Sequence, residues 1–191
     1  AMIVHRAGGT MRIIGIDPGS RATGYGVVER QGGRLAHVAH GVVRTAPAAS
    51  LAARLAEIHR GVAEAAHRYA PDLAVVERVF VAVNPSSAIV LGQARGAALA
   101  ALASAGLEVD ELSAREVKQA VTGAGGARKT DVQSMVARLL GLEAEPPSDA
   151  ADALAVAICR ARLGPLAGLV IGKRRKRRRP RSLADLGRLP G

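Results

Sequence analysis

The stretch Ile13-Ile14-Gly15-Ile16-Asp17-Pro18-Gly19-Ser20 joins an apolar run to a carboxylate and then turns through proline and glycine. A short apolar run ended by turn residues is typical of a buried strand, which we expect over residues 12–16. An ionised carboxylate at the end of such a strand loses hydration and needs a partner. Asp17 therefore either caps its own turn through the backbone, as aspartate commonly does, or binds a ligand.

Further strands and helices follow along the chain. Valine-rich alternation around Gly32-Gly33 predicts an antiparallel meander after the first strand. The expected strands are residues 12–16, 24–29, 35–44, 73–77 and 108–112. The expected helices are residues 50–69 and 85–105, two that start with capping boxes at Ser113 and Thr130, and a last one from near Ser148 to about Leu163. This order predicts a mixed α/β sheet covered on its faces.

Length and charge divide the chain into three parts. At 191 residues it has the size of one domain. Its net charge is +11, but eight of its 27 Lys and Arg lie within residues 173–181 without an acid, which leaves 19 basic against 16 acidic residues elsewhere. We expect residues 1–10 to be an extension outside the fold, 11–164 to be the folded domain, and 165–191 to be a disordered tail that solubilises the protein or binds polyanions.

Cysteine content and hydropathy indicate the compartment. Cys159 is the single cysteine, so it forms no internal disulfide and is expected to pack as a small hydrophobe on the last helix. No segment has the roughly 18 uninterrupted apolar residues of a membrane span, since the most apolar one contains Gln93 and Arg95. The N-terminus has no signal-peptide hydrophobic region. We therefore expect a cytoplasmic, reducing setting.

Three more acids occupy positions from which they could lie close to Asp17 in the folded protein. Glu77 ends a second apolar strand, and Asp149 and Asp152 lie three residues apart on one face near the start of the last helix. Acids at a helix start also complement the helix dipole, which is the simpler account of this pair taken alone. Four carboxylates together would make an oxygen-rich cluster suited to Mg²⁺ or Mn²⁺.

Several ordered segments between about residues 11 and 163 carry a resemblance to a known family. They are Gly15-Ile16-Asp17-Pro18-Gly19-Ser20, Thr23-Gly24-Tyr25-Gly26, Glu77 with Val79-Phe80, Leu91-Gly92-Gln93-Ala94-Arg95-Gly96, Val117-Lys118-Gln119 and Asp149-Ala150-Ala151-Asp152-Ala153-Leu154. Together they resemble the RuvC family of Holliday junction resolvases. The resemblance implies an RNase H-like fold, with a mixed five-stranded sheet and helices on both faces. It also implies that the family's four metal-binding acids are Asp17, Glu77, Asp149 and Asp152.

The resemblance further implies an activity and its partners. These are paired, metal-dependent nicks in four-way DNA junctions during recombination and repair, two Mg²⁺ or Mn²⁺ ions per site, and the branch-migration proteins RuvA and RuvB. Paired nicks in a nearly twofold-symmetric substrate favour a homodimer.

Five other residues are candidates for DNA contact. Phe80 matches a family aromatic that stacks on a base, although a lone Phe is commonly a core residue. Lys118 and Lys129 match family lysines near the cut phosphate, although Lys is most often a solvated surface charge. Arg95 and Arg115 are expected to add phosphate contacts.

Other functions match parts of the sequence. The segment from Gly123 to Thr130 superficially resembles a P-loop, but Arg128 stands where the pattern requires Gly and no buried strand precedes it. The first strand also resembles a phosphate loop of sugar kinases and actin-like ATPases, which need a second domain. A related RuvC-like RNA-processing nuclease and a noncatalytic DNA-binding module, dependent on the basic tail, stay open as alternatives.

Overall fold

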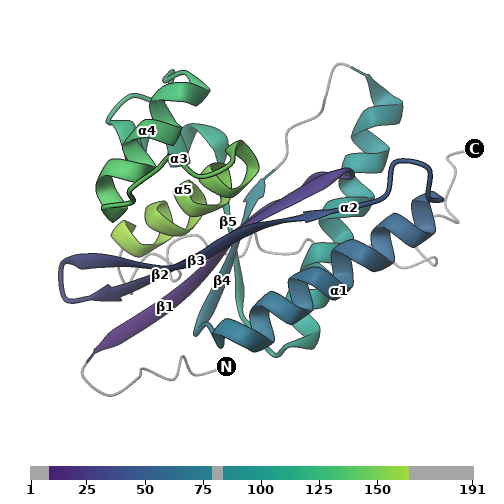
Figure 1. Ribbon diagram of the computed structural model, residues 1–191, viewed down its shortest axis with the longest axis horizontal. Helices are drawn as coiled ribbons and strands as arrows, with labels where there is room; N and C mark the ends of the chain where they lie inside the picture. The colour runs from purple at the N-terminus through teal and green to yellow at the C-terminus, as the bar shows by residue number, and fades with distance from the viewer. Residues whose placement is uncertain (1–8, 79–83, 164–191) are drawn as a thin grey trace, which may run out of the picture.

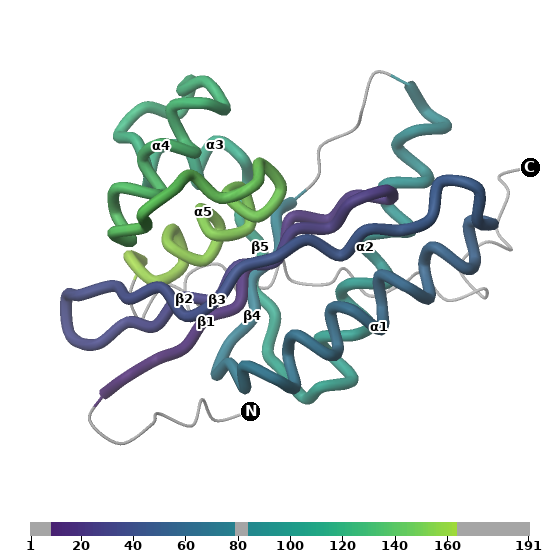
Figure 2. Tube along the Cα trace, in the orientation of Figure 1, coloured from purple at the N-terminus to yellow at the C-terminus, as the bar shows by residue number. Residues whose placement is uncertain are grey.

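The computed structural model describes residues 9–78 and 84–163 as a three-layer α/β arrangement (Figure 1). A twisted sheet lies between two groups of helices, and the chain trace shows the same layering (Figure 2). The strands are β1 Thr10–Asp17, β2 Ala22–Gln31, β3 Arg34–Arg44, β4 Leu73–Arg78 and β5 Val109–Ser113. All five expected strands are therefore confirmed, and the first begins at Thr10 rather than at Arg12.

The sheet has the order β3-β2-β1-β4-β5, so β1 is its central strand. β1, β2 and β3 form the predicted antiparallel meander, while β4 and β5 pair in parallel with β1 and β4, respectively. The carboxyl ends of parallel strands meet at one edge of a sheet, which is where α/β proteins commonly bind ligands. This topology brings the end of β1 and the end of β4 to the same edge.

The helices of the described part cover both faces of the sheet, as expected. They are α1 Leu51–Tyr69, α2 Pro85–Ser104, α3 Ala114–Thr122, α4 Lys129–Leu140 and α5 Ser148–Leu163. Helices α1 and α2 build one aliphatic core with Ile14, Ile16 and Val76, and α3 to α5 build the other with Ile13 and Val75. Neighbouring residues of one strand thus enter opposite cores, as the twofold alternation of a strand requires.

The helix starts confirm one of the two predicted capping boxes. At Ser113 the hydroxyl accepts from the Glu116 amide, and the Glu116 carboxylate accepts from the Ser113 amide. The box predicted at Thr130 is wrong, because the N-cap of α4 is Arg128, two residues earlier, and the helix begins at Lys129. Asp131 accepts hydrogen bonds from both the backbone and the side chain of Arg128, so this pair defines the helix start.

The most apolar helices differ in their surroundings. Cys159 on α5 is buried as predicted, and burial raises the pKa of its thiol to about 11. Among the described helices, α2 alone is long and apolar enough to cross a membrane by length and composition. One such helix is weak evidence of a membrane span, because length and composition alone do not distinguish it from a helix of a soluble domain. Ala94, Ala98 and Leu102 of α2 pack in the core, whereas most of the helix is not buried.

Candidate active site

Asp17 lies at the end of the central strand, among other carboxylates. The β1 register pairs it with Gly24 of β2, and β4 runs along the other side of β1. Burial raises the pKa of Asp17 from 3.8 to about 7, and the nearby charges of Glu77, Asp152 and Asp149 contribute to the rise. An acid with a pKa raised in this way is held where negative charge is unfavourable, and a bound cation would favour its ionised form.

Glu77 faces the same site from the neighbouring parallel strand. Val76 pairs with Ile16, so the next residue of β4 lies beside Asp17 at the edge of the sheet. Burial is the largest cause of the raised pKa of Glu77, and the charge of Asp152 raises it further. The charges of Lys129 and Lys118 oppose this rise. The two strand-end acids predicted from the sequence are therefore brought together.

Helix α5 carries the other two acids and lies directly on the backbone of the sheet. Glycines of β1 and β2 make this approach possible. A Cβ atom added to Gly15 would overlap the carbonyl oxygen of Ala153, one on Gly24 would overlap that of Asp149, and one on Gly26 would lie 2.6 Å from the amide nitrogen of Leu154. We call these three residues the glycine track. Because these glycines have no side chain, the backbone of α5 can lie directly against β1 and β2. The first turns of α5 therefore place Asp149 and Asp152 near the end of β1.

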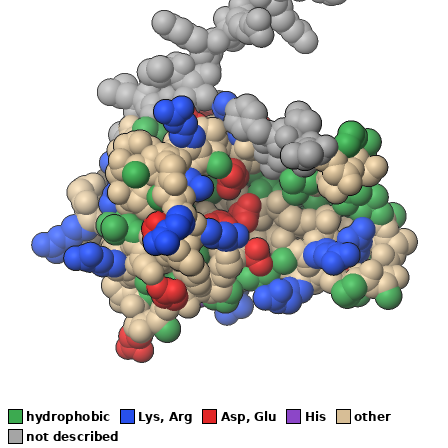
Figure 3. Space-filling model, turned by 90° about the horizontal axis from the view of Figure 1, so that it is seen from above, with side chains coloured by type: hydrophobic (Ala, Val, Ile, Leu, Met, Phe, Trp, Pro, Cys, Tyr) green, Lys and Arg blue, Asp and Glu red, His purple; other side chains and the backbone are tan. Residues whose placement is uncertain are grey.

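Lys129 forms an ion pair with one of these acids. Its Nζ atom lies 2.6 Å from a carboxylate oxygen of Asp152, and this hydrogen bond is the largest cause of the raised pKa of Lys129. Lys118 and Lys129 line a cavity of about 170 Å³ together with Glu77 and Asp152. Both lysines predicted to lie near the cut phosphate thus lie beside the acids. Figure 3 shows acidic side chains gathered on this face with Lys and Arg side chains around them.

The four carboxylates are suitable ligands for a hard divalent cation, although their side chains do not converge on a single point. Within residues 9–78 and 84–163, no three Asp, Glu, His or Cys side chains are arranged so that they could hold a metal ion. The charges of the other three acids nevertheless raise the pKa of Asp17, so the four carboxylates share one environment. Carboxylate oxygens are the ligands that Mg²⁺ and Mn²⁺ prefer. A cation would relieve the repulsion that Lys129 now offsets in part.

The remaining predicted contacts have different surroundings. Arg95 of α2 forms an ion pair with Glu111 at 2.6 Å, and its Nε donates to the backbone carbonyl of Glu77 at 3.4 Å. This contact supports the end of β4, and a phosphate contact of Arg95 stays a prediction. Arg115 is exposed on α3 and packs beside Gly125, away from the acids' cavity lining. Phe80 lies outside the described residues, so its stacking role also stays a prediction.

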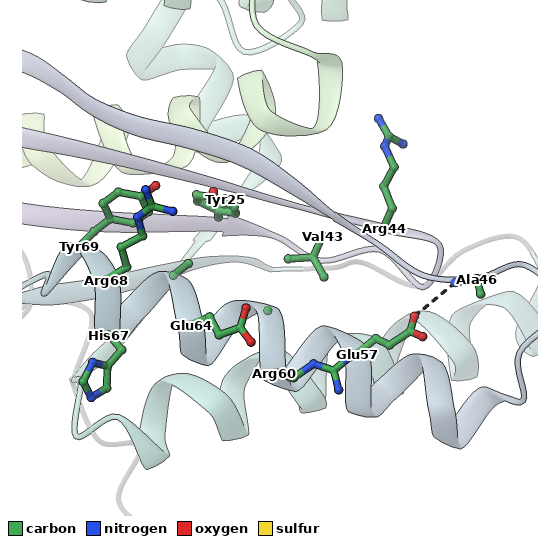
Figure 4. Close-up of a pocket in the computed structure, with 12 residues that line it drawn as sticks. Tyr25, Val43, Arg44, Ala46, Glu57, Arg60, Glu64, His67, Arg68 and Tyr69 are labelled. Carbon is green, nitrogen blue, oxygen red and sulfur yellow. Dashed lines mark hydrogen bonds between the residues drawn. The ribbon is translucent and has the colours of Figure 1, made fainter.

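A larger hollow lies elsewhere, between α1 and the outer strands of the meander. It has a volume of about 940 Å³, and its lining includes Tyr25, Val43, Arg60 and Glu64 but none of the four acids (Figure 4). In the close-up its charged side chains come mainly from α1, and Glu57 accepts a hydrogen bond from the amide of Ala46. Opposite charges are interspersed there, so the lining does not favour a ligand of one sign.

The sheet order and the helix across it define the class of protein. An open mixed sheet whose first three strands form a meander and whose fourth and fifth are parallel to the first is the RNase H-like fold. Comparison with known proteins agrees with this class. The family model for crossover junction endodeoxyribonuclease RuvC matches residues 13–160. The chain belongs to the RuvC family.

Individual relatives are similar over most of their length. The chain is 54% identical to a crossover junction endodeoxyribonuclease RuvC of Burkholderia vietnamiensis over 162 residues, which are 85% of this chain and 89% of that protein. It is 52% identical to the one of Cupriavidus metallidurans, covering 95% of this chain and 100% of that protein. The structure of T. thermophilus RuvC in complex with a Holliday junction substrate matches with a TM-score of 0.74 at 39% identity, over 79% of this chain and 93% of that one.

Sequence reasoning missed the role of the glycine track and the Lys129–Asp152 ion pair. Gly15, Gly24 and Gly26 interrupt strands that otherwise favour β-branched residues. Glycine inside a strand pattern is a known signal for close approach of another backbone. That signal was present in the sequence, but the element that makes the approach could not be named before α5 was placed.

Proposed function

We propose that this protein is a structure-selective endonuclease that resolves four-way DNA junctions by paired, metal-dependent nicks during recombination and repair. The observation that carries the proposal is membership of the RuvC family over residues 13–160, a span that contains all four acids. Related proteins carry the name crossover junction endodeoxyribonuclease, and a T. thermophilus relative was solved with a Holliday junction.

Asp17, Glu77, Asp149 and Asp152 would hold two Mg²⁺ or Mn²⁺ ions. Two such ions would lower the pKa of a water and stabilise the departing oxygen of a phosphodiester. The chain's own contribution is to hold the carboxylates on rigid elements, at the ends of β1 and β4 and on the first turns of α5. The raised pKa of Asp17 supports this role, because a bound cation would favour its ionised form.

Cationic and aromatic residues would bind the DNA around the acids. Lys118 and Lys129 line the cavity beside Glu77 and Asp152, where an ammonium group would stabilise negative charge that develops on the phosphate. Phe80 would stack on a base near the crossover, and Arg95 and Arg115 would contact phosphates. In the structure Lys129 forms an ion pair with Asp152.

The wider assembly is also a proposal. One chain supplies one acidic cluster, so paired nicks would need a homodimer. We propose the RuvA and RuvB branch-migration proteins as partners and a cytoplasmic setting, in which the buried thiol of Cys159 stays reduced. The nuclease domain would comprise residues 11–164, flanked by the extension 1–10 and the basic tail 165–191. Residues 1–8 of the extension and the whole tail lie outside the described part.

Cleavage of a synthetic four-way junction tests this proposal against a linear duplex of the same sequence. Wild-type protein should make paired nicks only in the junction, with Mg²⁺ or Mn²⁺, and Asp17→Asn should bind the junction without cutting it. Glu143→Gln is the matched control, because Glu143 is an exposed carboxylate outside the site. Equal cutting of both DNAs would refute junction selectivity, and full activity of Asp17→Asn would refute the acidic site.

A further inference from the structure

A second cationic surface lies near the carboxyl edge of the sheet. This hollow, which we call the Arg21 hollow, has a volume of about 430 Å³ and is lined by Ser20, Arg21, Arg54, Ser86, Ser87 and Val90. Its residues come from the turn between β1 and β2, from α1 and from the first turns of α2. The mechanism proposed above does not use it.

The chemistry of the lining favours an anion. Two guanidinium groups and three hydroxyl groups belong to it, and among the described residues it includes no carboxylate. Ser86 and Ser87 are exposed in the first turn of α2, behind the N-cap Asn84. Backbone N–H groups at a helix start and the positive end of the helix dipole both favour negative charge. The hollow therefore offers many hydrogen-bond donors and positive charge to a ligand.

Arg54 supplies independent support through its buried donor. Its terminal NH1 lies 3.4 Å from the backbone carbonyl of Ser20, but its Nε is buried without a hydrogen-bond partner among the described residues. A buried donor without an acceptor is unfavourable, and native proteins rarely leave one so. Arg21 is exposed and makes no ion pair with the residues that the structure describes. Arg21 thus has donors to spare for a ligand, and Arg54 adds a second guanidinium group to the lining.

The position of the hollow limits which anion it would take. Ser20 follows Asp17 by three residues, a reach of at most about 11 Å along an extended chain. Successive nucleotides of one strand advance by about 3.4 Å along a duplex, so the hollow lies within about three nucleotides of a phosphate held at Asp17. On the face shown in Figure 3, Lys and Arg side chains lie on more than one side of the central acids.

We infer that the Arg21 hollow binds a backbone phosphate of the DNA strand that is cut, a few nucleotides from the phosphate attacked at the acids. Arg21 and Arg54 donate to its oxygens, and the serine hydroxyls and the start of α2 complete the contact. A phosphate contact carries no base information, but it fixes the register of the strand. The hollow would therefore determine which phosphodiester reaches Asp17. This inference rests on the proposed nuclease function.

Salt-dependent binding of the variant Arg21→Ala provides the first test. Fluorescence anisotropy with a labelled junction in metal-free buffer separates binding from cutting. Loss of one phosphate contact should lower the slope of log K against log salt by about 0.9 and weaken binding about eightfold at 0.1 M salt. The matched control is Arg34→Ala. Arg34 is exposed and begins β3, whose other end, at Arg44, lies beside Ala22 and so near Arg21. Equal effects of the two substitutions would overturn the inference.

A phosphate scan then locates the contact and separates the two proposals. Methylphosphonates replace single phosphates on either side of the cut, and each DNA is titrated with wild type, Arg21→Ala and Arg54→Lys, whose folding is checked by circular dichroism. Neutralising one particular phosphate should weaken DNA binding by the wild type but not by Arg21→Ala. Binding by Arg54→Lys should be weakened by the same change, but less than binding by the wild type. If neutralising a phosphate and substituting Arg21 weakened binding additively at every position, the inference would be overturned, even if junctions were cut normally. The same scan on duplex DNA tests the hollow independently if junctions prove not to be preferred.

Discussion

Replacing Asp17 by asparagine should stabilise the metal-free protein, and increasingly so as the pH rises. Asn has nearly the same shape but cannot ionise, so Asp17→Asn removes the charge that burial and the neighbouring acids disfavour. The substitution should abolish cutting and yet make the fold harder to unfold. Such a trade between stability and activity is typical of functional sites.

The magnitude follows from the pKa of Asp17, which is 3.8 in a free side chain and about 7 in the folded protein. A tenfold change in an ionisation constant corresponds to about 1.4 kcal/mol, so ionised Asp17 destabilises the fold by up to about 4 kcal/mol. Below pH 3.8 both states are protonated and the cost vanishes. Between the two pKa values the folded protein keeps a proton that the unfolded chain has lost, so stability falls as the pH rises. At pH 5 the cost is about 1.7 kcal/mol, and above the folded pKa it is complete.

Urea unfolding in EDTA, followed by far-ultraviolet circular dichroism because the chain has no Trp, measures this difference. The stability of Asp17→Asn should exceed that of wild type by about 1 to 2 kcal/mol at pH 5 and by about 2 to 4 kcal/mol at pH 8.5, the lower figures allowing for solvent screening. Glu143→Gln should stay within about 0.5 kcal/mol of wild type at both pH values. A stability difference that did not grow with pH would refute the assignment of a raised pKa to Asp17.

Four further predictions concern other parts of the molecule. Gly24→Ala should lower the free energy of unfolding by about 3 kcal/mol or more in urea melts, because its Cβ would overlap the α5 backbone, whereas Gly33→Ala, with open space around it, should change it by less than about 0.5 kcal/mol. Arg160→Met should cost about 3 to 5 kcal/mol in the same assay, because it removes the guanidinium group that pairs with the partly buried carboxylate of Asp110. Lys129→Met should slow junction cutting about 100-fold in single-turnover assays while calorimetry shows tighter Mg²⁺ binding, since Lys129 competes for Asp152; weaker Mg²⁺ binding would contradict this. Deleting residues 165–191 should weaken junction binding and flatten its salt dependence, and binding unchanged across a salt series would exclude the tail from affinity.

The sheet and the acids were predictable because their signals are local. Alternation and turn residues located all five strands, because the period of a strand and the residues that end it are local features of the sequence. Asp17 and Glu77 were recognisable because each carboxylate ends an apolar run, where a charge without a partner is unfavourable. The start of α4 was missed because Thr130 fits a capping pattern, whereas in the structure Asp131 accepts from the backbone amide of the N-cap residue Arg128.

The electrostatic state of the site could not be read from the sequence. Lys129 and Asp152 meet only because α4 and α5 pack together against the sheet, and no periodic pattern encodes that contact. The pKa of Asp17 likewise depends on burial and on three acids that are distant in sequence. Motif resemblance predicted which acids form the site, but their protonation depends on the fold.

The glycine track sets the distance between α5 and the sheet independently of much of the aliphatic packing that stabilises the fold. At these three glycines helix α5 meets β1 and β2 through peptide atoms, whose positions are fixed by covalent bonds, while its side chains pack in the core that contains Ile13. Aliphatic substitutions in the core under α1 and α2, which contains no residue of α5, would therefore alter the stability of the fold while leaving the separation of α5 and the sheet the same. A designer could exchange a core residue such as Ile58 for heat resistance without readjusting the carboxylates of Asp149 and Asp152.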